Sequence, residues 1–144
     1  MSASGAIAEI VAERWMERTL ESYPPETSRS LLDEQDPFRN PAGHVIGECL
    51  KTLARELLGE MDERAIVSAL DAMVRLRAVQ DFRPSDALRF IFDLRDVLAE
   101  VTGALPRALD SRIDELALTA FDLYTACREQ IAGLREKELL ARSR

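Results

Sequence analysis

Apolar residues recur at intervals of three and four along almost the whole sequence, and no segment alternates apolar with polar residues. The first spacing places residues on one face of an α-helix, whereas strict alternation is typical of a half-buried β-strand. The β-branched residues that favour strands are never clustered. The pattern therefore predicts an all-α protein of five to seven helices joined by short connections.

The first helix is expected to run from about residue 4 to residue 22. It should stop before Tyr23, because a proline follows and disfavours helical backbone at the residue before it. A short helical turn from about Glu26 to Asp33 comes next. The large apolar residues of the first helix are expected to form its buried stripe: Ile7, Ile10, Val11, Trp15 and Leu20.

Capping residues mark the ends of the two central helices. Asn40 belongs to the residue types that cap helix N-termini and Pro41 suits the first helical position, so one helix should begin there. Gly59 can end it, and Asp62 can cap the next helix, which should reach about Gln80. The core positions expected along this second helix follow helical spacing: Ile66, Leu70, Met73, Val74 and Arg77.

Two helices are predicted in the last part of the chain, separated by Gly103. The first begins at Ser85 or its neighbour, and its core positions are Leu88, Ile91, Leu94, Leu98 and Val101. After Pro106 the sequence contains no further proline and a single glycine, which permits one helix to about Ala141. Such a helix is about 50 Å long, more than a domain of this size spans. Residues 126–144 should therefore project as a helix end.

The long final helix also carries a spacing that suits association. Its apolar positions alternate steps of three and four from Ala117 to Leu134, which is the heptad spacing of a coiled coil. We therefore predict a homodimer formed through this helix. The residues predicted at its interface are Tyr124, Cys127, Ile131 and Leu134. The alternative is that residues 117–127 belong to the ordinary core and only the end of the helix is exposed.

The composition is that of one folded domain, with 144 residues of which 47% are hydrophobic and 31% charged. The excess of acidic residues gives a net charge of −7, so we expect no nucleic-acid partner. No apolar run approaches the roughly 20 residues that span a bilayer, and the first residues lack the features of a signal peptide. We therefore expect a cytoplasmic protein with no membrane span.

Few side chains offer catalytic or metal-binding chemistry. The single histidine, His44, lies in the first turn of a predicted helix, and a structural role is expected because no nucleophile motif accompanies it. Cys49 and Cys127 are far apart in the sequence, so we expect both to be small buried apolar residues. We predict no catalytic residue, no metal site and no cofactor, and hence no enzyme.

Aromatic residues offer a further possibility, because small-molecule pockets are mostly apolar and often lie between helices. The residues that we expect at such a pocket are Trp15, Phe90 and Phe121. They leave open an alternative function, that of a helical carrier protein that binds a ligand or cofactor. The competing interpretation is that these residues fill an ordinary core.

Several segments together carry a resemblance to a known family: Glu13–Trp15, Glu21–Pro24, Asp36–Gly43, Arg77–Ser85, Asp114–Ala117, Phe121–Tyr124 and Cys127–Glu129. The patterns DPFxNPxG and RAVQDFxPS are moderately specific when they occur together. Over about residues 7 to 137 the chain resembles the N-terminal domain family of RsbT co-antagonist proteins of the RsbRD type.

This resemblance implies a globin-like helical domain that holds no haem, dimerises and continues into a long linker helix. It implies a non-catalytic sensory role in stressosome-type stress signalling, with a kinase, an anti-sigma factor or an STAS-containing protein as partner. In that family the linker leads into an STAS domain, and the present sequence ends at Arg144. Both a stand-alone chain that docks on another protein and a segment of a longer protein fit this.

Overall fold

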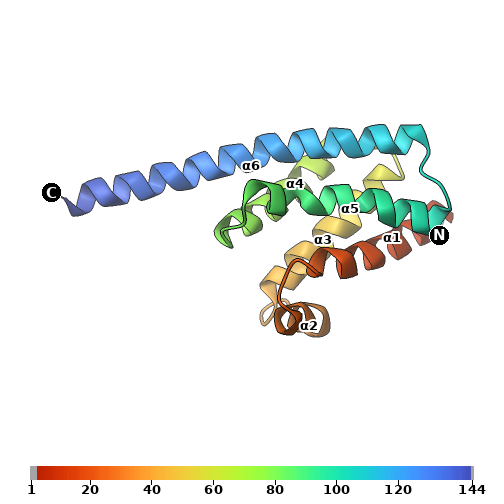
Figure 1. Cartoon of the computed structure of the whole chain (residues 1–144), viewed down its shortest axis with the longest axis horizontal. Coiled ribbons are helices and arrows are strands. Elements are labelled where there is room, and N and C mark those ends of the chain that lie inside the picture. The colour runs from red at the N-terminus through yellow and green to blue at the C-terminus, as the bar shows by residue number, and fades with distance from the viewer. Residues whose placement is uncertain (1–2, 144) are drawn as a thin grey trace.

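The computed structural model describes residues 3–143, which form six α-helices and no strand within that part of the chain (Figure 1). The helices are α1 (Ala3–Leu20), α2 (Pro25–Asp33), α3 (Pro41–Leu57), α4 (Glu63–Val79), α5 (Pro84–Thr102) and α6 (Arg107–Arg142). The predicted all-α fold and the predicted long C-terminal helix are both confirmed.

Local capping explains where several helices begin and end. The Asn40 side chain accepts a hydrogen bond from the Gly43 N–H at 2.9 Å, and the Asp62 side chain accepts one from the Arg64 N–H at 3.0 Å. Gly103 ends α5 in the left-handed conformation, with a φ of 80°, which glycine adopts without steric cost. All three caps were predicted because each depends only on neighbours along the chain.

The connection after α3 differs from the prediction. Helix α3 ends at Leu57, and the residue with a positive φ in this connection is Met61, at 56°, rather than Gly59. A Cβ added to Gly59 would lie 2.8 Å from the Arg55 carbonyl oxygen. The glycine is therefore needed for close approach of the backbone and not for a left-handed turn.

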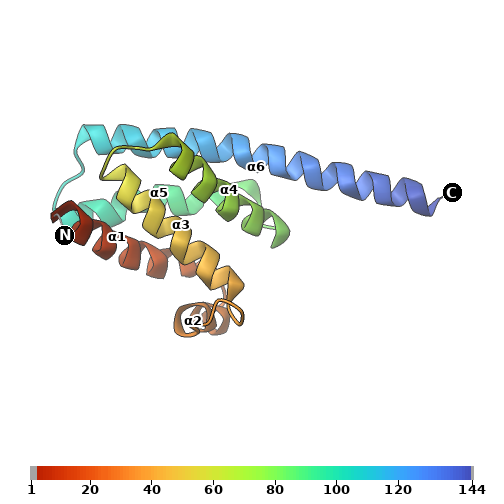
Figure 2. The ribbon, with the colours of Figure 1, turned by 180° about the vertical axis from the view of Figure 1, so that it is seen from behind.

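The core forms where α1, α3, α4, α5 and α6 pack together. Helix α1 packs on α3 and α5, α3 packs on α4, and α6 packs on α4 and α5. Figures 1 and 2 show α6 along one side of the molecule and α2 on the opposite side. The largest fully buried side chains come from α1, α3, α4 and α5 and include Trp15, Leu50, Leu53, Met73, Phe90 and Leu94.

The buried face of α1 corrects one prediction. Val11, Trp15 and Leu20 are buried as expected, whereas Ile7 and Ile10 are exposed. The positions that complete the inner face are small residues instead, Ala8 and Ala12. Alanine side chains let α1 approach α3 and α5 closely, and their spacing of three and four fits the same helical face. The prediction was wrong because it weighted large apolar residues over small ones.

Helix α6 extends well past the other helices (Figure 1). Its buried residues end at Cys127, so the helix continues for 15 residues, or about 22 Å, to Arg142 without a further buried side chain. Leu134, Leu139 and Leu140 on this part are exposed. Among the described helices none is both long and apolar enough to cross a membrane.

Candidate functional site around Arg77

Arg77 is a buried cation near the C-terminal end of α4. Its spacing from Leu70 and Met73 places it on the core face, as predicted, and only 1% of its surface is exposed. The guanidinium carbon lies 4.4 Å from the centre of the Phe82 ring, 5.2 Å from that of Tyr23 and 6.0 Å from that of Phe90. Arg77 is therefore surrounded mainly by aromatic faces.

The polar contacts of Arg77 are few for a buried guanidinium. Its Nη1 donates to the Ser22 hydroxyl at 3.3 Å, and its Nε has no hydrogen-bond partner. Burial lowers the pKa of Arg77. The nearby Tyr23 and Cys49 side chains act in the opposite direction, and no carboxylate contributes to this opposing effect. A guanidinium remains charged in proteins, and each cation–π contact offsets only about 0.5–2 kcal/mol of its desolvation. The site thus holds a positive charge without a neutralising anion from the described chain.

The turn after α4 folds Phe82 back over this charge. Asp81 has a positive φ of 62°, and the Phe82 N–H donates to the Arg77 carbonyl at 3.2 Å. Asp and Asn tolerate this left-handed conformation better than most other residues. The sequence Gln80-Asp81-Phe82 therefore closes α4 with a turn that also builds one wall of the Arg77 site.

Two tyrosines connect this turn to distant parts of the chain. The Tyr23 hydroxyl donates to Gln80 Oε1 at 2.7 Å, and the Tyr124 hydroxyl donates to the Phe82 carbonyl at 2.5 Å. Burial raises the pKa of Tyr23, while the positive charge of Arg77 opposes that shift. The connection between α1 and α2, the end of α4 and the middle of α6 consequently meet at one cluster.

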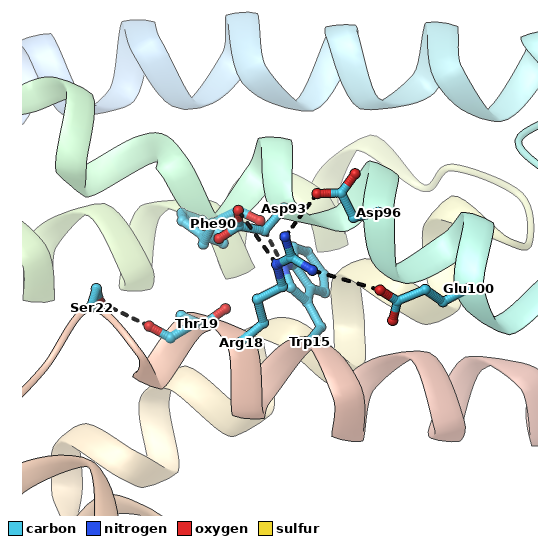
Figure 3. Close-up of polar contacts among 8 residues, drawn as sticks. All are labelled: Trp15, Arg18, Thr19, Ser22, Phe90, Asp93, Asp96 and Glu100. Atoms are coloured by element: carbon cyan, nitrogen blue, oxygen red, sulfur yellow. Dashed lines mark hydrogen bonds and ion pairs between the residues drawn. The ribbon is translucent and has the colours of Figure 1, made fainter. Parts of the chain in front are cut away.

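A second set of contacts fastens α1 to α5 beside this cluster (Figure 3). The Trp15 indole N–H donates to the Phe90 carbonyl at 2.6 Å, and the two rings stack with centroids 5.9 Å apart. Arg18 reaches from α1 to Asp96 at 2.8 Å and lies 3.8 Å from both Asp93 and Glu100. These contacts hold Phe90 against Arg77.

A pocket of about 240 Å³ opens next to Arg77. Thr19, which is 2% exposed and whose hydroxyl has no hydrogen-bond partner, lies in its wall together with Arg77. The remaining lining residues are Arg18, Glu21, Ser22, Asp86, Arg89, Phe90 and Asp93. Burial raises the pKa of Asp93, and the Arg18 charge opposes this shift. The pocket therefore combines two buried polar groups with charges of both signs.

A larger and more open groove of about 640 Å³ lies between α1, α2 and α3. His44 and Lys51 line it from α3, and its apolar or small lining residues are Ala12, Met16, Leu31, Leu32, Gly43 and Gly47. Its carboxylates are Glu9, Glu13, Glu17, Glu34 and Glu48. In the part of the chain that the structure describes, no three potential ligands come together to hold a metal ion. His44 is exposed at this groove.

The residues predicted to line a ligand pocket do not meet at one. Trp15 and Phe90 come together, but they stack in the core, and of the three only Phe90 borders either pocket described above. Phe121 lies on α6 and is 57% exposed. Neither of the two pockets is lined by all three of these side chains.

The residues predicted at a dimer interface fall into two groups. Tyr124 and Cys127 are buried within the chain, whereas Ile131 is only partly buried and Leu134 is 67% exposed. This placement favours the alternative that residues 117–127 belong to the ordinary core. The part of the predicted seam that is not buried in the core begins near Ile131.

Sequence reasoning did not identify the Arg77 cluster as a site. Helical spacing placed Arg77 among the core positions, and the segment Arg77–Ser85 was used only for the family resemblance and for the start of the next helix. The available signal was an arginine on the apolar face of a helix, since arginine is almost never fully buried unless paired. Three segments that carry the family resemblance, Glu21–Pro24, Arg77–Ser85 and Phe121–Tyr124, meet at this cluster.

Comparison with known proteins gives a family. Residues 9–139 match the family described as the RsbT co-antagonist protein rsbRD N-terminal domain. A protein of Archaeoglobus fulgidus, described as uncharacterized, is 29% identical over 132 residues, which cover 89% of this chain and 82% of that protein. No solved structure matches. Because the family match extends over most of the chain, the protein belongs to the RsbT co-antagonist rsbRD N-terminal domain family.

Proposed function

We propose that this chain is a non-catalytic sensory or regulatory domain in stressosome-type signalling, and that it acts through contacts with a second copy and with a signalling protein. The observation that carries this proposal is the membership of the rsbRD N-terminal domain family. The long α6, which leaves the core at Cys127 and continues as a single helix, supplies a surface for such contacts. Its partner would be a kinase, an anti-sigma factor or an STAS-containing protein.

The Arg77 cluster gives a physical route from the core to α6. Tyr124 on α6 bonds the Phe82 carbonyl, and Arg128 on α6 lies 3.6 Å from Asp81. Phe82 and Asp81 belong to the turn that covers Arg77. A change in the position of this turn would therefore alter how α6 is held. A signal acts in such a system by favouring one of two arrangements for which it has different affinities.

The exposed end of α6 is the proposed dimerisation surface. Ile131 and Leu134 continue the heptad spacing beyond the core, and apolar side chains on a helix without neighbours gain free energy by packing on another helix. Leu139 and Leu140 extend the exposed apolar surface toward the C-terminal end. A parallel pair of α6 helices would bury Ile131 and Leu134, whereas Leu139 and Leu140 lie outside this heptad seam.

The side chains with nucleophilic potential favour a non-catalytic role. Burial raises the pKa of the Cys49 thiol to about 12, so the reactive thiolate is disfavoured. Cys127 is also buried. The hydroxyls of Ser22 and Thr19 have no imidazole or carboxylate hydrogen-bonded to them that would act as a general base.

The alternative function, a helical protein that carries a ligand or cofactor, is supported by the open groove of about 640 Å³ and by the pocket of about 240 Å³ beside Arg77. Sites for drug-sized molecules usually have volumes of about 300–1,000 Å³, so this pocket suits a smaller molecule than a haem or a fatty acid.

The proposed function is tested by measuring self-association and partner capture with matched variants. Leu134→Asp places a charge on the proposed surface, and Leu118→Asp places one elsewhere on α6 at similar exposure, 64% against 67%. We expect Leu134→Asp to lower the dimer mass in sedimentation and to lose a signalling protein captured from native cytosol. Equal behaviour of both variants and the wild-type chain would contradict the proposal.

A further inference from the structure

The unmet hydrogen-bonding capacity of two buried side chains points to the pocket beside Arg77. Arg77 and Thr19 are 1% and 2% exposed, and both line this pocket. The Arg77 Nε and the Thr19 hydroxyl oxygen have no hydrogen-bond partner. Buried polar groups are almost always satisfied, and an unsatisfied one costs about 1–3 kcal/mol. A molecule in the pocket that accepts hydrogen bonds would satisfy both.

Three arginines and three carboxylates line the pocket, so its wall is balanced in formal charge, and the buried member of this set is Arg77. Asp93 lies 3.8 Å from Arg18, and Asp86 is paired with Arg83 at 2.8 Å. Two of the three carboxylates in the wall therefore have arginine partners, and the third, Glu21, is exposed. Arg77 has aromatic neighbours and no ion pair with a described carboxylate. A single negative charge in the pocket would neutralise it.

We propose that this pocket binds a small organic carboxylate, with the Arg77 guanidinium and the Thr19 hydroxyl as its hydrogen-bond donors. A guanidinium presents planar, paired donors that match the two oxygens of a carboxylate. Phe90 gives the pocket an apolar wall for the organic part. The carboxylates of Asp93 and Glu21 in the same wall disfavour an ion with two negative charges.

A bound carboxylate would compete with the aromatic rings for the guanidinium. Arg77 packs against both Phe82 and Tyr23, and Phe82 belongs to the turn that is bonded to α6. Occupancy would therefore bias the position of that turn. This regulatory meaning rests on the proposed function, whereas binding itself is a property of the chain alone.

Binding is tested by following the Arg77 Nε–H signal in ¹H–¹⁵N NMR spectra of the full chain during titration with sodium acetate. Sodium chloride at matched ionic strength and sodium sulfate are titrated in parallel. We expect a saturable shift with acetate, weaker binding of sulfate and no saturable shift with chloride. Thr19→Val keeps the shape of the side chain and should weaken acetate binding about tenfold, because it removes one hydrogen bond to a charged ligand.

Arg77→Gln should abolish saturable binding, whereas Arg135→Gln, on the exposed end of α6, should leave it unchanged. For Arg77→Gln the reporters are the backbone amide signals of Thr19 and Ser22. No saturable response of the wild-type chain, an equal response to chloride, or unchanged affinity in Thr19→Val would each overturn the inference. Because this titration needs neither a dimer nor a partner, its failure is distinct from failure of the proposed function.

Discussion

The Tyr124 hydroxyl donates a hydrogen bond to the Phe82 carbonyl at 2.5 Å and so joins the middle of α6 to the turn that covers Arg77. Tyr124 is 42 residues further along the chain than Phe82, and it is almost completely buried. The hydrogen bond therefore fixes α6 on the core at the last full turn before the helix leaves it. Its removal should lower the stability of the fold and weaken the attachment of α6 to the core.

Tyr124→Phe deletes this hydrogen bond, whose acceptor is the partly buried Phe82 carbonyl. We expect a loss of about 0.5–1.5 kcal/mol in the free energy of unfolding, measured by urea denaturation, which is the net contribution of a typical hydrogen bond. Phe121→Leu, at an exposed position one turn earlier, is the control and should change the free energy by less than about 0.5 kcal/mol. Equal effects of both variants would show that the hydrogen bond contributes nothing net.

Arg77→Met tests the energetic cost of the buried charge. Methionine has similar length and is apolar, so we expect the free energy of unfolding in chloride buffer to stay within about 1 kcal/mol of the wild-type value or to rise. Arg77→Ala leaves a cavity as well and should lose about 2–4 kcal/mol. If Arg77→Met loses as much as Arg77→Ala, the cation–π contacts outweigh the desolvation of the guanidinium.

Ile131→Asp combined with Leu134→Asp tests the proposed α6 pairing. Two carboxylates on the exposed end of the helix would face their copies in a dimer and repel them, so we expect the monomer mass in sedimentation or light scattering at concentrations where the wild-type chain is dimeric. Circular dichroism should show an unchanged helical content. A dimer of unchanged mass in this variant would exclude the pairing.

Cys49→Ala tests the consequence of the raised thiol pKa for stability at alkaline pH. The folded thiol keeps its proton to about pH 12, whereas the thiol of an unfolded chain has its ordinary pKa of 9.0. Unfolding therefore releases this proton above about pH 9, so the stabilising contribution is complete below that pH and falls as pH rises toward 12, by about 1.4 kcal/mol per unit. Urea denaturation at pH 8 and 10.5 should show a smaller decrease for Cys49→Ala than for the wild-type chain.

The sequence predicted those features that depend on near neighbours. Asn40, Asp62 and Gly103 could be assigned as caps because a cap is determined by two or three adjacent residues. The length of α6 was predictable because nothing in its sequence breaks a helix. The exposure of Ile7 and Ile10 could not be predicted from spacing alone. Residues on two neighbouring faces of α1 recur with the same helical period, so the period does not say which face is buried.

The Arg77 cluster could not be derived from periodicity. Its members come from the connection after α1, the end of α4, the start of α5 and the middle of α6, and they meet only because these helices pack in one particular order. Helical spacing states which side chains face inward but not which of them touch. A buried arginine among aromatic rings is therefore visible only when the packing is known.

The hydrogen bonds of Asn40 make α2 a locally separable part of the molecule. Helix α2 has no buried residue, and the Asn40 side chain donates to the carbonyls of Leu31 and Glu34 at 2.9 and 3.0 Å while it caps α3. Opening α2 exposes little apolar surface, so it should exchange its amide hydrogens at a far lower free-energy cost than α3. Asn40→Ala should speed exchange throughout α2 and in the first turn of α3 only, because the variant loses both hydrogen bonds to the end of α2 and the cap of α3.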